Sequence, residues 1–178
     1  MPSGNKSKLI NDPLHGFVTL PSALVYDVVQ HPYFQRLRRI RQLGMSEWVY
    51  PGATHTRFHH ALGAMNLMVK ALDTLRGKGV EITEEEKEAA ILGILMHDIG
   101  HGPYSHTLEY TLAQGVNHED ISIMLMERMN IEFGGALRLA IDIFRGDYHK
   151  KPFLHQLISG ELDMDRLDYL MRDSFYTG

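Results

Sequence analysis

Apolar residues recur at intervals of three and four positions along most of this chain, which is the spacing of one face of an α-helix. After residue 20 no run of alternating apolar and polar residues, the pattern of half-buried strands, stands out. The pattern therefore predicts an all-α helical bundle. Helices are expected over residues 21–31, 32–44, 56–77, 83–98, 104–114, 118–130, 135–145, 152–159 and 164–174.

The first twenty residues differ from the rest of the chain. The stretch KLINDPLHGFVTLP places an Asp-Pro turn signal between two short apolar runs. This arrangement is typical of a small β-hairpin or of an extended arm. A length of 178 residues indicates one domain, so we expect an N-terminal hairpin or arm over 1–20 and a helical domain over 21–178.

Polar residues mark two of the expected helix starts. Thr83 with Glu86 three positions later matches a capping box, in which each side chain bonds the backbone N–H of the other residue. Asp163 stands at the N-cap position of the last helix. These residues predict a helix that runs from Thr83 into His97 and Asp98, and another that begins near Met164.

Composition limits the available chemistry. The chain has no cysteine, so disulfides are excluded and any transition metal must be bound by histidine and carboxylate. No stretch approaches the roughly 20 apolar residues of a membrane span, and the N-terminus has no apolar signal region. We therefore expect a cytoplasmic protein without a membrane partner.

The charge distribution bears on the ligand. The net charge of −4 disfavours a broad surface for nucleic acid. Residues 36–41, RLRRIR, nevertheless contain four arginines. An acidic protein with a local arginine cluster suits a small anionic ligand better than a long polyanion.

Two histidines and an aspartate lie in apolar parts of the chain. His60 shares a helix face with Ala64 and further apolar residues, whereas the adjacent His59 lies on a more polar face of the same helix. Asp98 follows a strongly apolar helix, and an unpaired buried carboxylate is costly. A hydrogen-bonded core histidine is one interpretation of His60; a divalent cation that also binds His97 and Asp98 is the other.

A further inward-facing carboxylate is expected in the segment ELDMDRLDYLMRD. Asp163 is assigned to the helix cap, which leaves two aspartates within the helix. Helical spacing does not choose between Asp165 and Asp168 as a fourth ligand.

The chain resembles the HD-domain metal-dependent phosphohydrolases in HH at 59–60, HD at 97–98 and DMDRLDY at 163–169. The blocks INDPLHGFVTL, FQRLRRIRQLG, YPGATHTRFHHALG, HDIGHGPYSH and DMDRLDYLMRDSFYTG are similar, in order, to the deoxynucleoside triphosphate triphosphohydrolase branch. The resemblance implies an HD-domain helical bundle with one divalent metal ion, which is Fe, Mn, Zn, Ni or Co. The implied metal ligands are His60, His97, Asp98 and Asp165.

The resemblance also implies a reaction. Members of this branch convert a deoxynucleoside triphosphate, which can be bound together with Mg²⁺, to a deoxynucleoside and triphosphate. By similarity His118 is the general acid and Glu109 orients it, while His101 and His106 contact phosphates or water. The alternative for His118 is a residue of the first helical turn, with Asn117 as the cap.

Substrate contacts follow from the same similarity. Arg57 and Arg166 are expected to bind phosphate oxygens, for which the guanidinium fork is well suited. A surface ion pair is the alternative for Arg57, and simple packing is the alternative for the last helix. The residues expected around the deoxyribose are Gln42, Leu43, Tyr169 and Asp173.

Assembly and regulation are implied as well. Relatives are commonly homo-oligomers, and Lys8, Asn11 and Arg38 lie in blocks that resemble a nucleotide-binding regulatory region. Gln30 stands where guanine-regulated relatives carry an acidic residue, so we expect no guanine-nucleotide activation.

Family members continue beyond DSFYTG, so the domain over 21–178 is expected to lack the family's C-terminal part. The alternative functions are another nucleotide phosphatase or phosphodiesterase, and a regulatory nucleotide-binding module without turnover.

Overall fold

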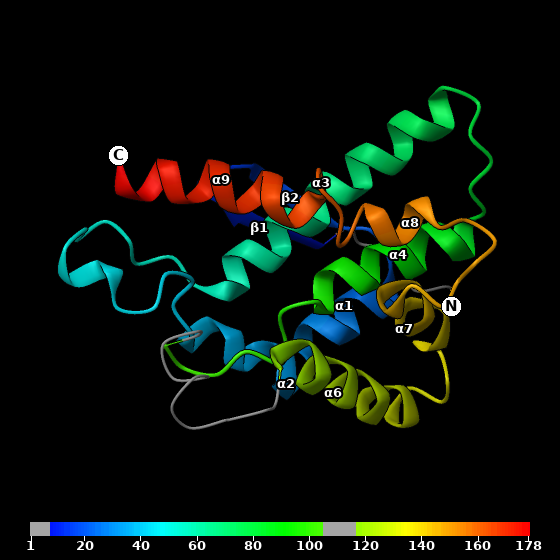
Figure 1. Cartoon of the computed structure of the whole chain (residues 1–178), viewed down its shortest axis with the longest axis horizontal. Helices are drawn as coiled ribbons and strands as arrows, with labels where there is room; N and C mark the ends of the chain where they lie inside the picture. The colour runs from blue at the N-terminus through cyan, green and yellow to red at the C-terminus, as the bar shows by residue number, and fades with distance from the viewer. Residues whose placement is uncertain (1–7, 105–116) are drawn as a thin grey trace.

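The computed structural model describes residues 8–104 and 117–178, and it shows a helical bundle with a small antiparallel sheet (Figure 1). This confirms the predicted fold class. Within the described residues, no helix has both the length and the apolar character needed to cross a membrane. The longer helices are α1 (Ala23–Gln30), α3 (Arg57–Gly77), α4 (Glu84–Met96), α6 (His118–Glu132), α7 (Arg138–Arg145) and α9 (Met164–Thr177).

The N-terminal segment forms a hairpin. Strands β1 (Lys8–Asp12) and β2 (Gly16–Leu20) pair in antiparallel register, with Ile10 opposite Val18. The side chain of Asp12 accepts hydrogen bonds from two backbone N–H groups of the turn, those of Leu14 and His15. Val18 is fully buried, so the hairpin is anchored to the core by its second strand.

The segment after α1 corrects one prediction. A single helix over 32–44 was expected, but α2 (Pro32–Gln35) passes into a short 3₁₀ helix over Arg36–Arg39, and the helical backbone ends there. Residue Ile40 is extended, and the backbone of this stretch pairs with the segment before α3: Gln42 N donates to His55 O, and Arg57 N donates to Ile40 O. These hydrogen bonds replace the helical ones and bring residues 40–42 beside the start of α3.

Three helices form the centre of the bundle. Helices α4 and α9 both pack on α3, and Figure 1 shows α9 crossing it. The close approach of α9 depends on Gly63, because a β-carbon at this position would collide with the side chains of Asp168 and Arg172. The element expected to approach the small residues beside His60 is therefore α9.

We expect Gly63→Ala to lower the free energy of unfolding by about 1–3 kcal/mol, because the added methyl group forces two buried side chains of α9 to move. Gly77→Ala on the same helix is the control, since a β-carbon there meets nothing within 4 Å. Chemical denaturation of both variants measures the difference. Equal stability of the two variants would contradict the close packing described for Gly63.

The capping box at the start of α4 is present and extends into a buried polar cluster. Glu86 Oε2 accepts from Thr83 N at 2.8 Å and from Lys151 Nζ at 2.6 Å, while Oε1 accepts from the Tyr148 hydroxyl at 2.6 Å. Burial by itself raises the pKa of Glu86, but these hydrogen bonds lower it to about 2. The carboxylate thus joins α4 to the loop between α7 and α8 (Phe153–Gln156).

This cluster predicts a loss of stability in acid. A carboxyl group whose pKa is lowered from 4.5 to about 2 stabilises the fold above pH 4.5, and that contribution disappears as the pH falls toward 2. We expect Glu86→Gln to lower the free energy of unfolding by about 3 kcal/mol at pH 7, with a gap that closes in acid. Urea denaturation at several pH values tests this, with the exposed Glu85→Gln as the control. A gap that does not change with pH would show that the charge of Glu86 is not involved.

Candidate functional site

Three side chains from three helices meet at one point. His60 lies on α3, His97 follows the last residue of α4, and Asp165 lies in the first turn of α9. The distance from His60 Nε2 to Asp165 Oδ1 is 2.8 Å, and from His60 Nε2 to His97 Nε2 it is 3.3 Å. One ligand atom from each residue lies within 4.8 Å of the other two. The group is therefore compact enough to hold a metal ion.

Asp98 lies beside this group. Its Oδ1 atom is 3.4 Å from His97 Nε2 and 3.2 Å from His101 Nε2, and its Oδ2 atom is 3.8 Å from His60 Nε2. Arg57 Nη1 donates to Oδ2 at 2.5 Å. The position of Asp98 is compatible with its predicted role as a fourth ligand.

Both histidines direct the same ring nitrogen toward the centre. His97 Nδ1 donates to the carbonyl oxygen of Ile94 at 2.6 Å, and His60 Nδ1 donates to Asp168 Oδ2 at 2.8 Å. With the Nδ1 atoms engaged, the two Nε2 atoms face each other and the carboxylates. A histidine ligand whose second nitrogen is held by a carbonyl or a carboxylate is typical of metal sites.

Burial and charge act in opposite directions on these groups. Burial lowers the pKa of His60, but hydrogen bonds to Asp165 and Asp168 raise it to about 10. Burial raises the pKa of Asp98, but the neighbouring His97 and Arg57 hold it well below its usual range. The carboxylates are therefore ionised at neutral pH. The raised pKa means that His60 carries a proton at neutral pH, which a bound cation would have to displace. With that proton gone, two imidazole nitrogens and ionised carboxylate oxygens are a donor set that fits a borderline divalent cation.

The backbone that carries the His-Asp pair is fixed from two sides. Ser122 of α6 accepts a hydrogen bond from Gly100 N and donates to the carbonyl oxygen of His97, each at 2.8 Å. Arg36 donates to the carbonyl oxygens of Ile99 and His101. Neither Ser122 nor Arg36 was identified from the sequence as part of the site.

A buried network lies behind His60. Asp168 accepts from His60, from Arg172 of the same helix and from His15 of the hairpin turn. Arg172 also donates to Asp12. The sequence left Asp165 and Asp168 as alternatives, and the structure places one on each ring nitrogen of His60. The i,i+4 spacing of Asp168 and Arg172 was a usable signal for their pairing, whereas periodicity gives no sign of the hairpin residues.

Of the predicted catalytic residues, the structure places two. The His101 and His118 rings stack with centroids 3.9 Å apart, and His101 also contacts Asp98. His118 is the first residue of α6 and Asn117 caps this helix, as the alternative interpretation of His118 predicts, and its role as general acid remains a prediction. Glu109 and His106 lie outside the described residues, so their roles remain predictions.

The two predicted phosphate-binding arginines have different surroundings. Arg57 is only 4 % exposed and bonds Asp98, so the alternative of a surface ion pair is wrong. Arg166 is exposed and donates to the carbonyl oxygen of Glu161 at 2.9 Å. Arg57 therefore lies at the candidate metal centre, and the phosphate contacts of both arginines stay predictions.

Two of the residues predicted to surround the deoxyribose are linked through a buried histidine. His55 Nε2 lies 2.7 Å from Asp173 Oδ1, and the His55 carbonyl oxygen accepts from Gln42 N at 3.1 Å. Leu43 and Tyr169 are half-buried. The sugar contacts of all four remain predictions.

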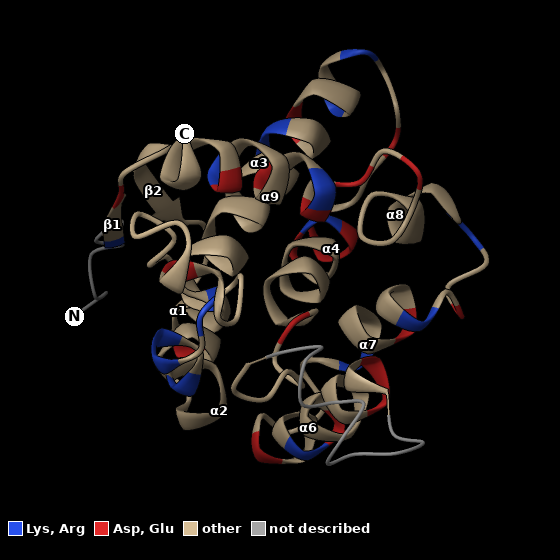
Figure 2. Cartoon of the chain, turned by 60° about the vertical axis from the view of Figure 1, so that its left-hand side comes forward, with Lys and Arg blue, Asp and Glu red and all other residues tan. Residues whose placement is uncertain are grey.

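Three of the four arginines of residues 36–41 have separate partners in the structure. Arg36 bonds the loop after α4, Arg38 lies 3.6 Å from the centre of the Phe58 ring, and Arg41 pairs with Glu47 at 3.1 Å. Across the ribbon, basic and acidic positions are interspersed (Figure 2). The segment therefore contributes to several contacts in the fold as well as to the predicted positive charge.

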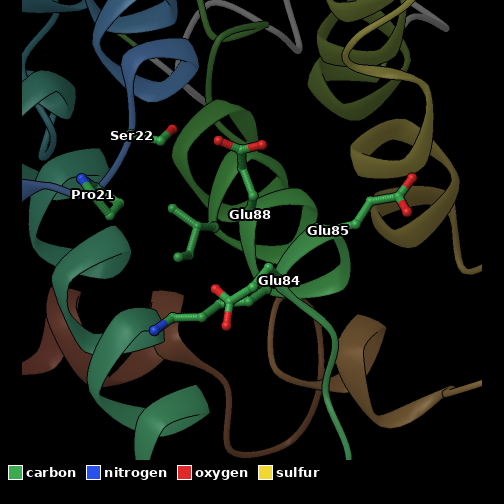
Figure 3. Close-up of a pocket in the computed structure, with 7 residues that line it drawn as sticks. Pro21, Ser22, Glu84, Glu85 and Glu88 are labelled. Carbon is green, nitrogen blue, oxygen red and sulfur yellow. The ribbon is translucent and has the colours of Figure 1, made fainter. Parts of the chain in front are cut away.

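A separate surface pocket lies at the start of α4. Figure 3 shows Glu84, Glu85 and Glu88 around it, opposite Pro21 and Ser22. Its acidic rim disfavours an anionic ligand. The pocket does not include the candidate metal ligands, so the two sites are distinct.

Comparison with known proteins agrees with this geometry. A family model described as the HD domain matches residues 57–173. The crystal structure of a phosphohydrolase from Bacteroides thetaiotaomicron superposes with a TM-score of 0.94 at 61 % identity, over 97 % of this chain and 43 % of that one. This match extends the likeness to the N-terminal hairpin, which the family model does not cover.

Two curated relatives extend the comparison. The uncharacterized protein YwfO of Bacillus subtilis is 36 % identical, over 99 % of this chain and 42 % of the relative. The deoxynucleoside triphosphate triphosphohydrolase SAMHD1 of Homo sapiens is 32 % identical, over 96 % of this chain and 33 % of the relative. The chain thus spans less than half the length of either relative. From its matched residues and its fold, the chain belongs to the HD domain family of phosphohydrolases.

Proposed function

We propose that this protein hydrolyses deoxynucleoside triphosphates to a deoxynucleoside and triphosphate with the help of one divalent cation. The observation that carries the proposal is the convergence of His60, His97 and Asp165, with Asp98 and the buried Arg57 beside them. The named activity of SAMHD1 relatives supports the choice of substrate. The proposed ligands are His60, His97, Asp98 and Asp165, and the identity of the ion is left open among Fe, Mn, Zn, Ni and Co.

In the proposed reaction water attacks the α-phosphorus, which requires a polarised phosphoryl oxygen and positive charge near the phosphate chain. A bound divalent cation supplies Lewis-acid polarisation of a phosphoryl oxygen and lowers the pKa of the attacking water. Arg57 is held beside the centre by its bond to Asp98, and its guanidinium group, whose fork suits phosphate oxygens, is proposed to bind the phosphate chain. Its positive charge opposes the negative charge that accumulates on the phosphate chain during the reaction.

Proton transfer is assigned to the adjacent histidine pair. The departing 5′-oxygen of the deoxynucleoside needs a proton, and His118 is proposed to donate it. His101 lies between Asp98 and the ring of His118, so it connects the proposed donor with the centre. Glu109 is proposed to orient His118, and His106 to contact phosphate or water.

The deoxyribose is proposed to lie near the C-terminal half of α9. Gln42 and Asp173 both contact His55, which groups two of the four proposed sugar contacts in one place. Arg166 is proposed to reach phosphate oxygens from the first turns of α9 once substrate offers a stronger partner than a backbone carbonyl. Association into homo-oligomers is also proposed, and size-exclusion chromatography with light scattering tests it.

A product assay tests the proposed reaction. The protein, dialysed and then loaded in turn with Mn²⁺, Fe²⁺, Co²⁺, Ni²⁺ or Zn²⁺, is incubated with the four deoxynucleoside triphosphates, the ribonucleotides and the deoxynucleoside monophosphates. Release of triphosphate together with the deoxynucleoside supports the proposal. Release of monophosphate instead would assign another nucleotide phosphatase or phosphodiesterase, and nucleotide binding without turnover would assign a regulatory module.

A further inference from the structure

The turn of the N-terminal hairpin contacts the last helix of the chain. His15 Nε2 lies 2.6 Å from Asp168 Oδ1, and Arg172 Nη1 donates to Asp12 Oδ2 at 2.9 Å. Asp12 Oδ1 also accepts from the N–H groups of Leu14 and His15 at 3.0 and 2.9 Å. The carboxylate that binds Arg172 therefore also shapes the turn that presents His15.

This network reaches the candidate metal centre through Asp168. Its Oδ2 atom accepts from His60 Nδ1 and from Arg172 Nε, both at 2.8 Å. Its Oδ1 atom accepts from His15 and, at 3.0 Å, from Arg172 Nη2. Four contacts from three residues fix the orientation of this carboxylate, and the carboxylate in turn fixes the ring of His60.

The network is buried, although it consists of charged and polar side chains. Asp12 is 2 % exposed, and Asp168 and Arg172 are fully buried. Apolar residues of similar volume often stabilise a fold as well as such ion pairs, so stability alone does not require an ionic network at this place. A partner that holds the second nitrogen of a histidine ligand commonly changes metal affinity by about 10- to 100-fold.

The two histidines of the centre are held in different ways. His97 Nδ1 donates to the carbonyl oxygen of Ile94 three residues earlier, so its orientation is a property of the end of α4. His60 depends instead on a side chain of α9, and that side chain depends on the hairpin. The orientation of one ring is local, and that of the other is set by both ends of the described chain.

We propose that Asp12 and His15 are positioning residues of the metal centre, which act through Asp168 and Arg172 on the orientation of His60. The inference rests on the metal-binding part of the proposed function and is independent of the substrate. It assigns the hairpin a role in metal binding that follows from its contacts, beyond its packing on the core.

Titration of the chain with Co²⁺ alone tests this role, because the visible absorption of bound Co²⁺ reports both affinity and ligand geometry. We compare His15→Leu, which removes the bond to Asp168, with His15→Gln, whose side-chain amide can restore it. The expected result is an affinity about 10-fold lower for His15→Leu with an altered spectrum, and recovery of much of both in His15→Gln. The matched control is Val18→Ala, which removes buried apolar volume from the same hairpin without touching the network.

The outcomes separate this inference from the proposed reaction. Unchanged Co²⁺ affinity and spectrum in His15→Leu, or an equal loss in Val18→Ala, would overturn the positioning role even if triphosphate is released. A selective loss in His15→Leu supports it even if no nucleotide is hydrolysed. Should His15→Leu fail to fold, Asp12→Asn decides instead: its one amide oxygen can still accept from the N–H groups of the turn, but an NH₂ group replaces the oxygen that accepts from Arg172 Nη1. Unchanged Co²⁺ binding in that variant would refute the role.

Discussion

Replacing His97 by alanine should abolish metal binding and turnover while the helical fold is retained. The change removes one of three ligand atoms that lie within 4.8 Å of each other. Loss of an outer partner alone commonly costs 10- to 100-fold in metal affinity, so loss of a ligand should cost more than about 100-fold. The fold should persist because His97 follows the end of α4 and alanine is compatible with its helical backbone.

Metal content after dialysis, Co²⁺ titration and the triphosphate assay measure this effect, and circular dichroism checks the fold. His59→Ala is the matched control, because His59 neighbours a ligand but its ring bonds Thr56 at the start of α3. This control should lose some stability and keep the metal. Should His97→Ala retain both metal and activity, the ligand assignment is wrong.

The second large effect concerns stability. We expect Arg172→Met to lower the free energy of unfolding by about 3–5 kcal/mol, because it leaves the carboxylates of Asp12 and Asp168 buried without their guanidinium partner. Such a loss is a large part of the stability of an ordinary domain, which is about 5–15 kcal/mol. Metal binding should weaken as well, since Asp168 holds His60.

Arg166→Met is the control for this prediction. It removes the same charge and nearly the same volume from the same helix, but Arg166 is exposed and bonds only a nearby carbonyl group among its described contacts. Urea denaturation of both variants, followed by circular dichroism, gives the comparison. If the two substitutions cost the same, the buried network does not stabilise the fold in the way its geometry indicates.

Local patterns were sufficient for much of the fold and for part of the site. Helical spacing selected His60 over His59, and His60 is fully buried while His59 is half-buried. The capping signals at Thr83 and Asp163 are both present as hydrogen bonds. In each case the relevant contacts lie within a few residues along the chain, so the sequence pattern contains them.

Other features depend on contacts between distant segments, which no local pattern reports. The helix expected over 32–44 ends early because residues 40–42 bond the backbone before α3. Helical spacing did not distinguish Asp165 from Asp168, and in the structure both contact His60, one at each ring nitrogen. The contact of His15 with Asp168 joins residues 153 positions apart, and that of Asp12 with Arg172 joins residues 160 positions apart.

The distribution of the donor atoms along the chain has a consequence for synthesis. His60 and His97 are synthesised before α9, and α9 carries Asp165 together with the network residues Asp168 and Arg172. A nascent chain that has not yet docked α9 holds neither the carboxylate of Asp165 nor the support of His60. Because a cation bound only by the assembled site would stabilise that site, ion uptake would be linked to the docking of α9. The ion would then bind tightly only to chains in which α9 and the N-terminal hairpin have docked beside α3.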